Sequence, residues 1–336
     1  MYFKDSLRHR QSWLGVALLL VILFHLPFDM GFFNHIKNIG YCGVDICFFA
    51  SGIGCFFSLS SDSDVGNFMK RRFIRLFPTY LIFIVCWLVL RYFSGEFDLQ
   101  MALGNILTIQ YFTGQDNYFN WYISALILFY FLAPYLKITI DRTKTIHKIF
   151  LLTVFCACSV PFWYSSTYLI TVSRLPIFYI GMLFANICQK NKQISKKHIF
   201  SLIISFTIGI LFLAASMIYM KGRLTAFGLL WYPFILIVPP FCVGISYVLT
   251  LLEKNKITKP LVSFLSLCGN DSFELYLIHI GLISAISLFT TKFNLSETNL
   301  FVWITGGGAL VIGCFILRRL SIFFINLYKS IFHKST

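Results

Sequence analysis

The chain has 336 residues, of which 58% are hydrophobic and 12% are charged, and its formal net charge is +15. Soluble domains carry about 25% charged residues, so the composition excludes an ordinary soluble globular protein, and the apolar content excludes a disordered one. A surplus of 28 Lys and Arg over 13 Asp and Glu also suits nucleic-acid binding, but in membrane proteins basic residues collect in the cytoplasmic loops. The positions of the basic residues along the chain decide between nucleic-acid binding and membrane topology.

Ten stretches of the chain are apolar over about the 20 residues that a helix needs to cross the hydrocarbon core. They cover residues 12–28, 42–59, 74–93, 119–139, 148–164, 172–189, 199–219, 226–251, 272–291 and 299–322. Barrel strands would be about ten residues long and would alternate in polarity. The first stretch lacks the cleavage site of a signal peptide. The sequence therefore predicts an all-α integral membrane protein with about ten transmembrane helices, as a single domain over residues 1–336 without an appended soluble domain. Between the third and fourth stretches, residues 99–112 are apolar enough for a re-entrant or interfacial helix.

The basic residues are distributed unevenly around these stretches. With the N-terminus in the cytoplasm, 22 of the 28 Lys and Arg fall on the inner side. Those on the outer side are Lys37, Arg91, Arg174, Lys221, Arg223 and Lys292. This asymmetry predicts that both termini are cytoplasmic, and it accounts for the positive charge without nucleic acid. The 10 Cys lie in or beside apolar stretches and lack metal-binding spacing, so we expect neither a disulfide framework nor a metal site.

Two ionisable side chains lie near the outer surface, inside apolar stretches where such groups indicate function by default. His25 is near the outer end of the first stretch, and Asp45 lies about one turn into the second, so both fall within the outer ~10 Å of the hydrocarbon. A carboxylate beside an imidazole fixes its tautomer and raises its basicity, as a general base requires. Two structural alternatives stay open: an interfacial His25 bonded to a backbone carbonyl, and Asp45 in an ion pair or helix cap.

A basic cluster, Lys70–Arg75, precedes the third stretch on the inner side. Its spacing places Arg71, Arg72 and Arg75 close together on a helix, where guanidinium groups suit phosphate recognition. The alternative is a topology signal in contact with lipid headgroups.

Further polar and aromatic side chains lie on candidate substrate paths. Trp121 and Ser124 begin the fourth stretch and Arg174 begins the sixth, so all three belong to the outer layer of His25. His279 lies in the inner half of the ninth stretch, about 10 Å from the inner surface. We therefore expect His279 on a different level from His25, in a substrate-path or structural polar role rather than in direct catalysis.

Six runs of the sequence together resemble the membrane-bound acyltransferase-3 family, and they extend over most of the chain. They are the helix ending in His25, Gly43-Val-Asp45-x-x-Phe-Phe-x-Ser51-Gly52, Lys70-Arg-Arg-x-x-Arg75-Leu-x-Pro78-x-Tyr80, Trp121-Tyr-x-Ser124 with Tyr130 and Pro134, Arg174-Leu-Pro-x-Phe-x-x-Gly181, and Ser272-Phe-x-Leu-Tyr276-Leu-x-His279. Members of this family acylate sugars of polysaccharides and other envelope glycans. The resemblance implies that His25 is the catalytic histidine and that the basic run around Arg71, Arg72 and Arg75 serves acyl-CoA.

One position departs from the family pattern, which has Arg or Lys, then ten residues, then the histidine. Here that position is Leu14, and Arg10 lies one helical turn earlier, from where a long side chain can bend along the helix. A family member that has lost catalysis is therefore one alternative.

The resemblance implies an integral-membrane O-acyltransferase, multi-pass in the cell membrane. It would move an acyl group, acetyl as the expected case, from acyl-CoA on the cytoplasmic side to a hydroxyl of an envelope or exopolysaccharide sugar, free or lipid-linked. His25, oriented by Asp45, would act as a base or carry the acyl group itself. The thioester supplies the driving force, so acyl-CoA is a co-substrate and no bound cofactor or metal is expected.

A polytopic transporter or flippase of lipid-linked sugars is the rival from another class, since buried His and Asp also suit proton coupling. The lack of a repeated half in the sequence stands against it.

Overall fold

The structure is a computed structural model that describes residues 2–113, 120–162, 166–219, 229–296 and 298–332. In chain order the helices are α1 (Phe3–Ser6), η1 (Leu7–His9), α2 (Arg10–His25), η2 (Gly31–Phe33), α3 (Asn34–Ile39), α4 (Cys42–Ser61), α5 (Val65–Phe93), α6 (Leu99–Ile106), η3 (Gln110–Thr113), α7 (Trp121–Arg142), α8 (Thr145–Ala157), η5 (Val160–Phe162), α9 (Ser166–Val172), α10 (Leu175–Gln189), α11 (Lys196–Tyr219), α12 (Pro233–Lys254), α13 (Lys259–Asn270), α14 (Ser272–Lys292) and α15 (Leu300–Phe332). Within the described residues, 10 helical segments are long and apolar enough to cross a membrane. The prediction of an all-α membrane protein with about ten spans is confirmed.

Most of these helices extend further than the apolar stretches that predicted them. The first spanning segment begins at Phe3 instead of residue 12, and the third begins at Val65 instead of residue 74. Hydropathy falls where charged residues begin, whereas Lys and Arg are good helix formers and continue the helix beyond the hydrocarbon. The Lys70–Arg75 cluster is therefore part of α5, whose N-cap Asp64 accepts a hydrogen bond from the backbone of Asn67. The predicted start of the eighth span at residues 226–228 and the basic residues Lys221, Arg223 and Lys334 lie outside the described residues.

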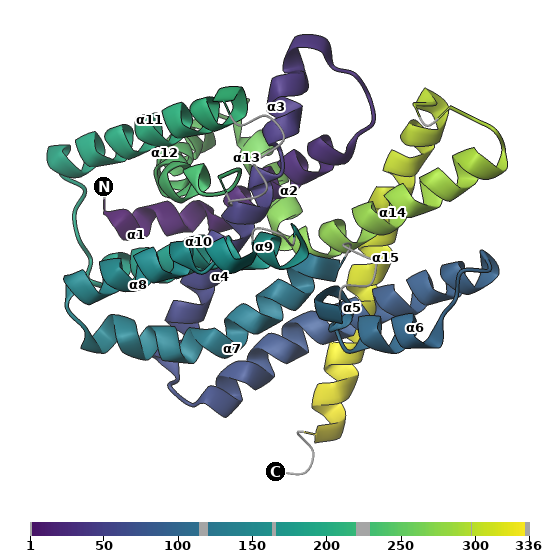
Figure 1. Cartoon of the computed structure of the whole chain (residues 1–336), viewed down its shortest axis with the longest axis horizontal. Helices are drawn as coiled ribbons and strands as arrows, with labels where there is room; N and C mark the ends of the chain where they lie inside the picture. The colour runs from purple at the N-terminus through teal and green to yellow at the C-terminus, as the bar shows by residue number, and fades with distance from the viewer. Residues whose placement is uncertain (1, 114–119, 163–165, 220–228, 297, 333–336) are drawn as a thin grey trace.

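Helix α4 runs through the middle of the bundle and packs against α2, α7 and α10 (Figure 1). Its approach to α10 depends on glycines. A Cβ added to Gly52 would lie 2.1 Å from the carbonyl oxygen of Phe178, and one added to Gly181 would lie 2.2 Å from that of Phe49. Small residues let helix backbones touch, which is a common basis of helix association in bilayers. The central helix can therefore present side chains to several neighbours at once.

Helices α2 and α13–α14 lie side by side, run in the same direction and keep a constant register. Ser12 Oγ lies 2.8 Å from Ser266 Oγ, and a Cβ added to Gly15 would lie 3.2 Å from the backbone nitrogen of Gly269. An offset of 254 positions separates the members of both pairs. Helix α13 is missing from the predicted spans because its 12 residues are too few to cross the membrane. It nevertheless sets where α14 begins.

The apolar segment at residues 99–112 forms α6 and η3 beside α5, in agreement with the predicted helix. Its residue Asn105 is fully buried. The carbonyl oxygen of Asn105 accepts from the hydroxyl of Tyr80 at 2.6 Å, and its side-chain oxygen accepts from Asn120 at 2.9 Å. These bonds join the segment to α5 and to the beginning of α7.

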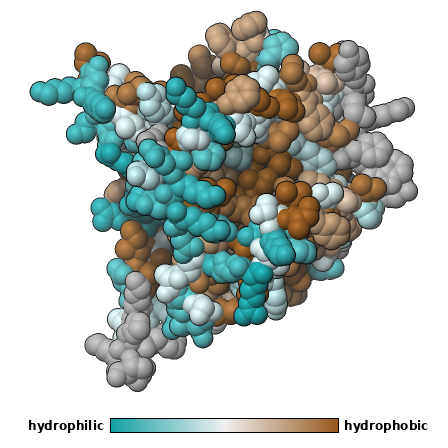
Figure 2. Space-filling view, turned by 90° about the vertical axis from the view of Figure 1, so that its left-hand side faces the viewer, coloured by the Kyte–Doolittle hydropathy of each residue, from teal (hydrophilic) through white to brown (hydrophobic). Residues whose placement is uncertain are grey.

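One side of the molecule carries many hydrophilic residues (Figure 2). Figure 2 faces the side on which the N-terminus and the α7–α8 and α10–α11 turns lie in Figure 1, and hydrophilic residues gather over much of it. These turns include basic residues that the sequence analysis assigns to the inner side, namely Arg142, Lys144, Lys190 and Lys192. The N-terminus and two of the assigned inner turns therefore lie on the same side of the bundle (Figure 1).

Candidate functional site

A cavity of roughly 160 Å³ lies between α2, α4, α5, α7 and the α13–α14 junction. One part of its wall is polar and is formed by Arg10, Arg72, Arg75, Asn270, Ser272 and Glu274. Another part is apolar and aromatic and includes Leu18, Cys47, Tyr122, Leu126 and Tyr276. A ligand with a charged head and a long, less polar arm matches this division.

Three arginines from two helices line the cavity: Arg10 of α2, and Arg72 and Arg75 of α5. A Cβ added to Gly54 of α4 would lie 3.5 Å from the Arg10 guanidinium and 3.8 Å from that of Arg72. Both guanidinium groups therefore lie beside the same point of α4. Neighbouring like charges repel each other, and a bound polyanion would relieve the repulsion. Arg10 shares the cavity wall with Leu14. Arg10 thus brings a positive charge to the cavity wall from one turn before Leu14.

Arg72 is held firmly at this wall. It donates a hydrogen bond to the carbonyl oxygen of Gly54 at 2.6 Å. Its guanidinium also lies over the rings of Phe68, at 5.3 Å, and Tyr130, at 5.5 Å, which are cation–π distances. By contrast, no hydrogen bond or ion pair engages Arg75 among the described residues, so its charge is available to a ligand.

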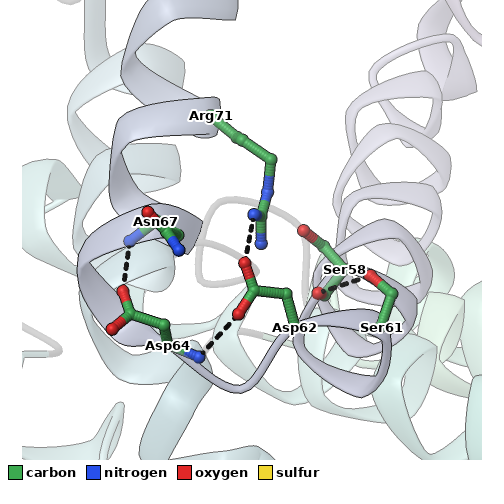
Figure 3. Close-up of polar contacts among 6 residues, drawn as sticks. All are labelled: Ser58, Ser61, Asp62, Asp64, Asn67 and Arg71. Carbon is green, nitrogen blue, oxygen red and sulfur yellow. Dashed lines mark hydrogen bonds and ion pairs between the residues drawn. The ribbon is translucent and has the colours of Figure 1, made fainter. Parts of the chain in front are cut away.

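Arg71 lies away from the cavity, which corrects the prediction that it shares a phosphate site with Arg72 and Arg75. Its guanidinium donates to Asp62, in the α4–α5 turn, at 2.7 Å (Figure 3). This bond, followed by one from the backbone of Asp64, lowers the pKa of Asp62. Asp62 therefore stays charged at pH values below the ordinary carboxyl range. The ion pair with Arg71 is lost only as the pH falls through this lowered pKa. Consecutive residues point about 100° apart on a helix, so Arg71 and Arg72 cannot face the same cavity.

His25 and His279 are neighbours, with ring centroids 5.3 Å apart. This corrects the prediction that they lie at different depths. The cause is the register of α2 with α13–α14, because the two histidines are separated by the same 254 positions as the Ser12–Ser266 and Gly15–Gly269 pairs. Helix α14 follows α13 and therefore begins inside the bundle, not at its inner surface. The prediction treated residue 272 as the inner surface, so it placed His279 too close to that surface.

Both imidazole rings use Nδ1 within their own helices. Nδ1 of His25 lies 2.8 Å from the carbonyl oxygen of Val21, and Nδ1 of His279 lies 3.1 Å from that of Leu275. A carbonyl oxygen only accepts, so Nδ1 carries the proton in each neutral ring and Nε2 carries the lone pair. The structural alternative for His25 therefore accounts for one of its nitrogens only. His25 is exposed, whereas Nε2 of His279 is buried and has no hydrogen-bond partner among the described residues.

Two tyrosines lie between the cavity and the histidine pair. Tyr122 of α7 and Tyr276 of α14 both line the cavity, and their ring centroids are 4.9 Å apart. The ring of Tyr276 also lies 5.5 Å from that of His279. Contacts thus continue from the arginine-lined cavity through Tyr276 and His279 to His25.

Asp45 faces Arg174 instead of His25, which corrects the prediction that it orients the histidine. Its Oδ1 lies 3.9 Å from Nε of Arg174, and both side chains are buried. The direction of the Asp45 side chain follows from the packing of Gly43, two residues earlier. Gly43 lies so close to α2 that an added Cβ would be 2.1 Å from the carbonyl oxygen of Ala17. Two residues rotate a helix by about 200°, so Asp45 points away from α2. The structural ion pair, the alternative for Asp45, is the arrangement found.

Arg174 is enclosed by two tryptophans, with its guanidinium 5.1 Å from the ring of Trp121 and 4.8 Å from that of Trp231. The structure thus brings Trp121, Arg174 and Asp45 together. Trp231 is a site residue that the sequence analysis missed, although a tryptophan beside Tyr and Pro at the start of a span is typical of a membrane interface. Ser124 lies elsewhere, since its hydroxyl donates to the carbonyl oxygen of Thr108 at 2.6 Å and ties α7 to the α6–η3 segment.

The histidine pair also has a signal in the sequence that was not among the predicted motifs. The spacing Ser-x2-Gly-x9-His occurs at Ser12–His25 and again at Ser266–His279. Two parallel helices that cross at glycines and keep a constant register bring equivalent positions side by side. A histidine ten residues after each glycine is therefore expected to meet its counterpart.

A family model described as an acyltransferase domain matches residues 15–319, which includes both histidines and every charged residue of the cavity wall except Arg10. No curated protein and no solved structure gives a significant match.

Proposed function

The chain belongs to the acyltransferase-3 family and is a multi-pass membrane acyltransferase, and from this we propose that it moves the acyl group of acyl-CoA, acetyl in the first instance, to a hydroxyl of an envelope or exopolysaccharide sugar at the cell membrane. The membership also decides against the transporter or flippase. The observation that carries the proposal is the sequence of contacts from three arginines, through the cavity, to a pair of histidines.

The donor would enter from the arginine end. The phosphates of acyl-CoA would form charge-assisted hydrogen bonds with Arg10, Arg72 and Arg75, and its arm would occupy the less polar part of the cavity. The thioester would reach the histidines when the rings of Tyr122 and Tyr276 move apart. In this arrangement the acyl donor and the glycan acceptor approach His25 from opposite sides.

His25 would carry out the transfer through Nε2, the ring nitrogen that Val21 leaves free. As the sugar oxygen attacks the thioester carbonyl carbon, Nε2 of His25 accepts the hydroxyl proton. The ester C–O bond forms and the C–S bond breaks. The thiolate then receives the proton back from His25 and leaves as CoA. If His25 carries the acyl group itself, the same nitrogen attacks the thioester first.

The direct test uses the purified protein in lipid vesicles, acetyl-CoA labelled in the acetyl group, and the lipid-linked glycan fraction of the source cell. We expect label to appear on the glycan as an alkali-labile ester that depends on the protein. A protein that binds acetyl-CoA and glycan but forms no ester would contradict the proposal.

We further propose that both termini, and with them the arginine end of the cavity, face the cytoplasm, because 22 of the 28 Lys and Arg then lie inside. A reporter that is active only in the cytoplasm should be active when fused after residue 336, and inactive when inserted in the outer segment near Lys292. The opposite pattern would place the donor cavity on the outer side and contradict the proposal.

Removing one cavity arginine should weaken donor binding. We expect Arg75→Gln to raise KM for acetyl-CoA by roughly tenfold or more, since a hydrogen bond between charged groups contributes about 1.5–3 kcal/mol, while kcat changes little. Arg71→Gln is the matched control, because the same charge is removed four residues away from a side chain paired with Asp62. Equal increases in KM for both variants would mean that net charge, and not the cavity, attracts the donor.

A further inference from the structure

Nε2 of His279 is a buried polar atom in the ring next to His25, and the proposed mechanism does not use it. Nδ1 of His279 is 3.1 Å from the carbonyl oxygen of Leu275, so the lone pair of the neutral ring is on Nε2. That nitrogen is buried and has no hydrogen-bond partner among the described residues. An unsatisfied buried acceptor costs about 1–3 kcal/mol. This cost is offset when a ligand brings a donor to it.

The place of His279 restricts what the donor can be. The side chain is 3% exposed, whereas His25 beside it is open, so a sugar hydroxyl arriving from the outside meets His25 first. On its other side, His279 contacts Tyr276, which lines the cavity. The group that satisfies Nε2 therefore comes with the ligand that fills the cavity.

Acyl-CoA has one N–H close to its thioester, on the amide nitrogen two carbons from the sulfur. Four bonds separate this nitrogen from the thioester carbonyl carbon, and at about 1.5 Å each they reach roughly 5 Å when extended. The ring centroids of His279 and His25 are 5.3 Å apart. An amide held at one ring thus places the reacting carbon beside the other.

We propose that His279 is a positioning residue, which accepts a hydrogen bond at Nε2 from the pantetheine amide N–H nearest the sulfur and so sets the thioester carbon beside Nε2 of His25. The inference rests on the proposed function, because it requires acyl-CoA to be the donor. In this proposal, His279 transfers no proton and forms no covalent bond.

The test compares acetyl-CoA with an analogue in which that amide N–H is replaced by an ester oxygen. The arginine contacts are the same for both donors. In the wild-type protein we expect kcat/KM to be about tenfold higher for acetyl-CoA, the size of one hydrogen bond. In His279→Phe, which keeps an aromatic ring and removes the acceptor, the ratio of the two donors should fall to about one. In His279→Gln, whose amide oxygen can accept, part of the ratio should return.

A histidine far from the site provides the control. His147 is exposed near the beginning of α8, and His147→Phe should keep the full ratio. If His279→Phe does not fold, His279→Leu replaces it as the variant without an acceptor.

A ratio near one in the wild-type protein, or an equal ratio in the wild type and the variant without an acceptor, would overturn the inference and leave the proposed function standing. A wild-type protein that uses neither donor would instead overturn the proposed function.

Discussion

Replacing His25 by alanine should reduce acyl transfer by roughly 10³-fold or more, since a positioned general base contributes about 10² to 10⁴ in rate. The reason is that Val21 engages only Nδ1 of His25, so Nε2 of the exposed ring is available to an incoming hydroxyl. The rate of ester formation from labelled acetyl-CoA on the glycan measures the effect. Binding of acetyl-CoA should be nearly unchanged, because the proposed phosphate site lies at the other end of the same helix.

The exposure of His25 supplies a second readout. Free imidazole at high concentration should restore part of the activity of His25→Ala, because the base can diffuse into the space that the side chain leaves. The matched control is His35→Ala, which removes another exposed histidine on the outer side, in α3, and should retain full activity. A His25→Ala protein that transfers acetyl at the wild-type rate would remove His25 from the mechanism.

The second large effect concerns folding. Arg174→Met should lower the free energy of unfolding by about 3–5 kcal/mol, the usual cost of leaving one charge of a buried pair without its partner. The side chains of Arg174 and Asp45 are only 3% and 2% exposed, so water cannot compensate for the loss. The change should appear as a lower midpoint of thermal unfolding in detergent, with little change in KM of the protein that stays folded.

A double-variant cycle separates this pair from a simple loss of packing. Asp45→Leu alone should also destabilise, since Arg174 then remains charged between Trp121 and Trp231. The double variant Asp45→Leu/Arg174→Met should cost clearly less than the sum of the two single changes, because no uncompensated charge remains. Additive losses would mean that the two side chains do not interact, and that the 3.9 Å contact contributes nothing.

Hydropathy predicts the helices well because each span has to satisfy its backbone inside lipid with a run of apolar residues. The same measure fails for α13, whose 12 residues never cross the membrane alone. It also ends spans too early at basic runs such as Lys70–Arg75, which continue α5. Apolar content therefore predicts which segments are buried in lipid, but not where a helix ends or which short helix supports another.

The site is harder to predict because depth in the membrane does not determine the direction of a side chain. Asp45 has the depth of His25 but points to α10, since the glycine contact at Gly43 turns the opposite face of α4 toward α2. Arg71 and Arg72 are neighbours in the chain, yet they serve an ion pair and the cavity, respectively. The direction of each side chain depends on which helices pack against each other. This packing is determined by contacts between residues that are far apart in the sequence.

The glycine crossing of α2 with α13 also restricts the size of the acyl carrier. Arg10 and His25 are the first and last residues of a single helix of 16 residues, and at 1.5 Å per residue they are about 22 Å apart. This separation is fixed because both residues belong to one helix. The Gly15–Gly269 contact leaves no space for α2 to slide along its partner, so both residues also keep their place relative to α13 and α14. A short activated acyl compound, such as an acyl phosphate, could reach either end but not both. Under the proposed function, the length of this rigid helix thus requires a donor long enough to span it, whatever the charge of that donor.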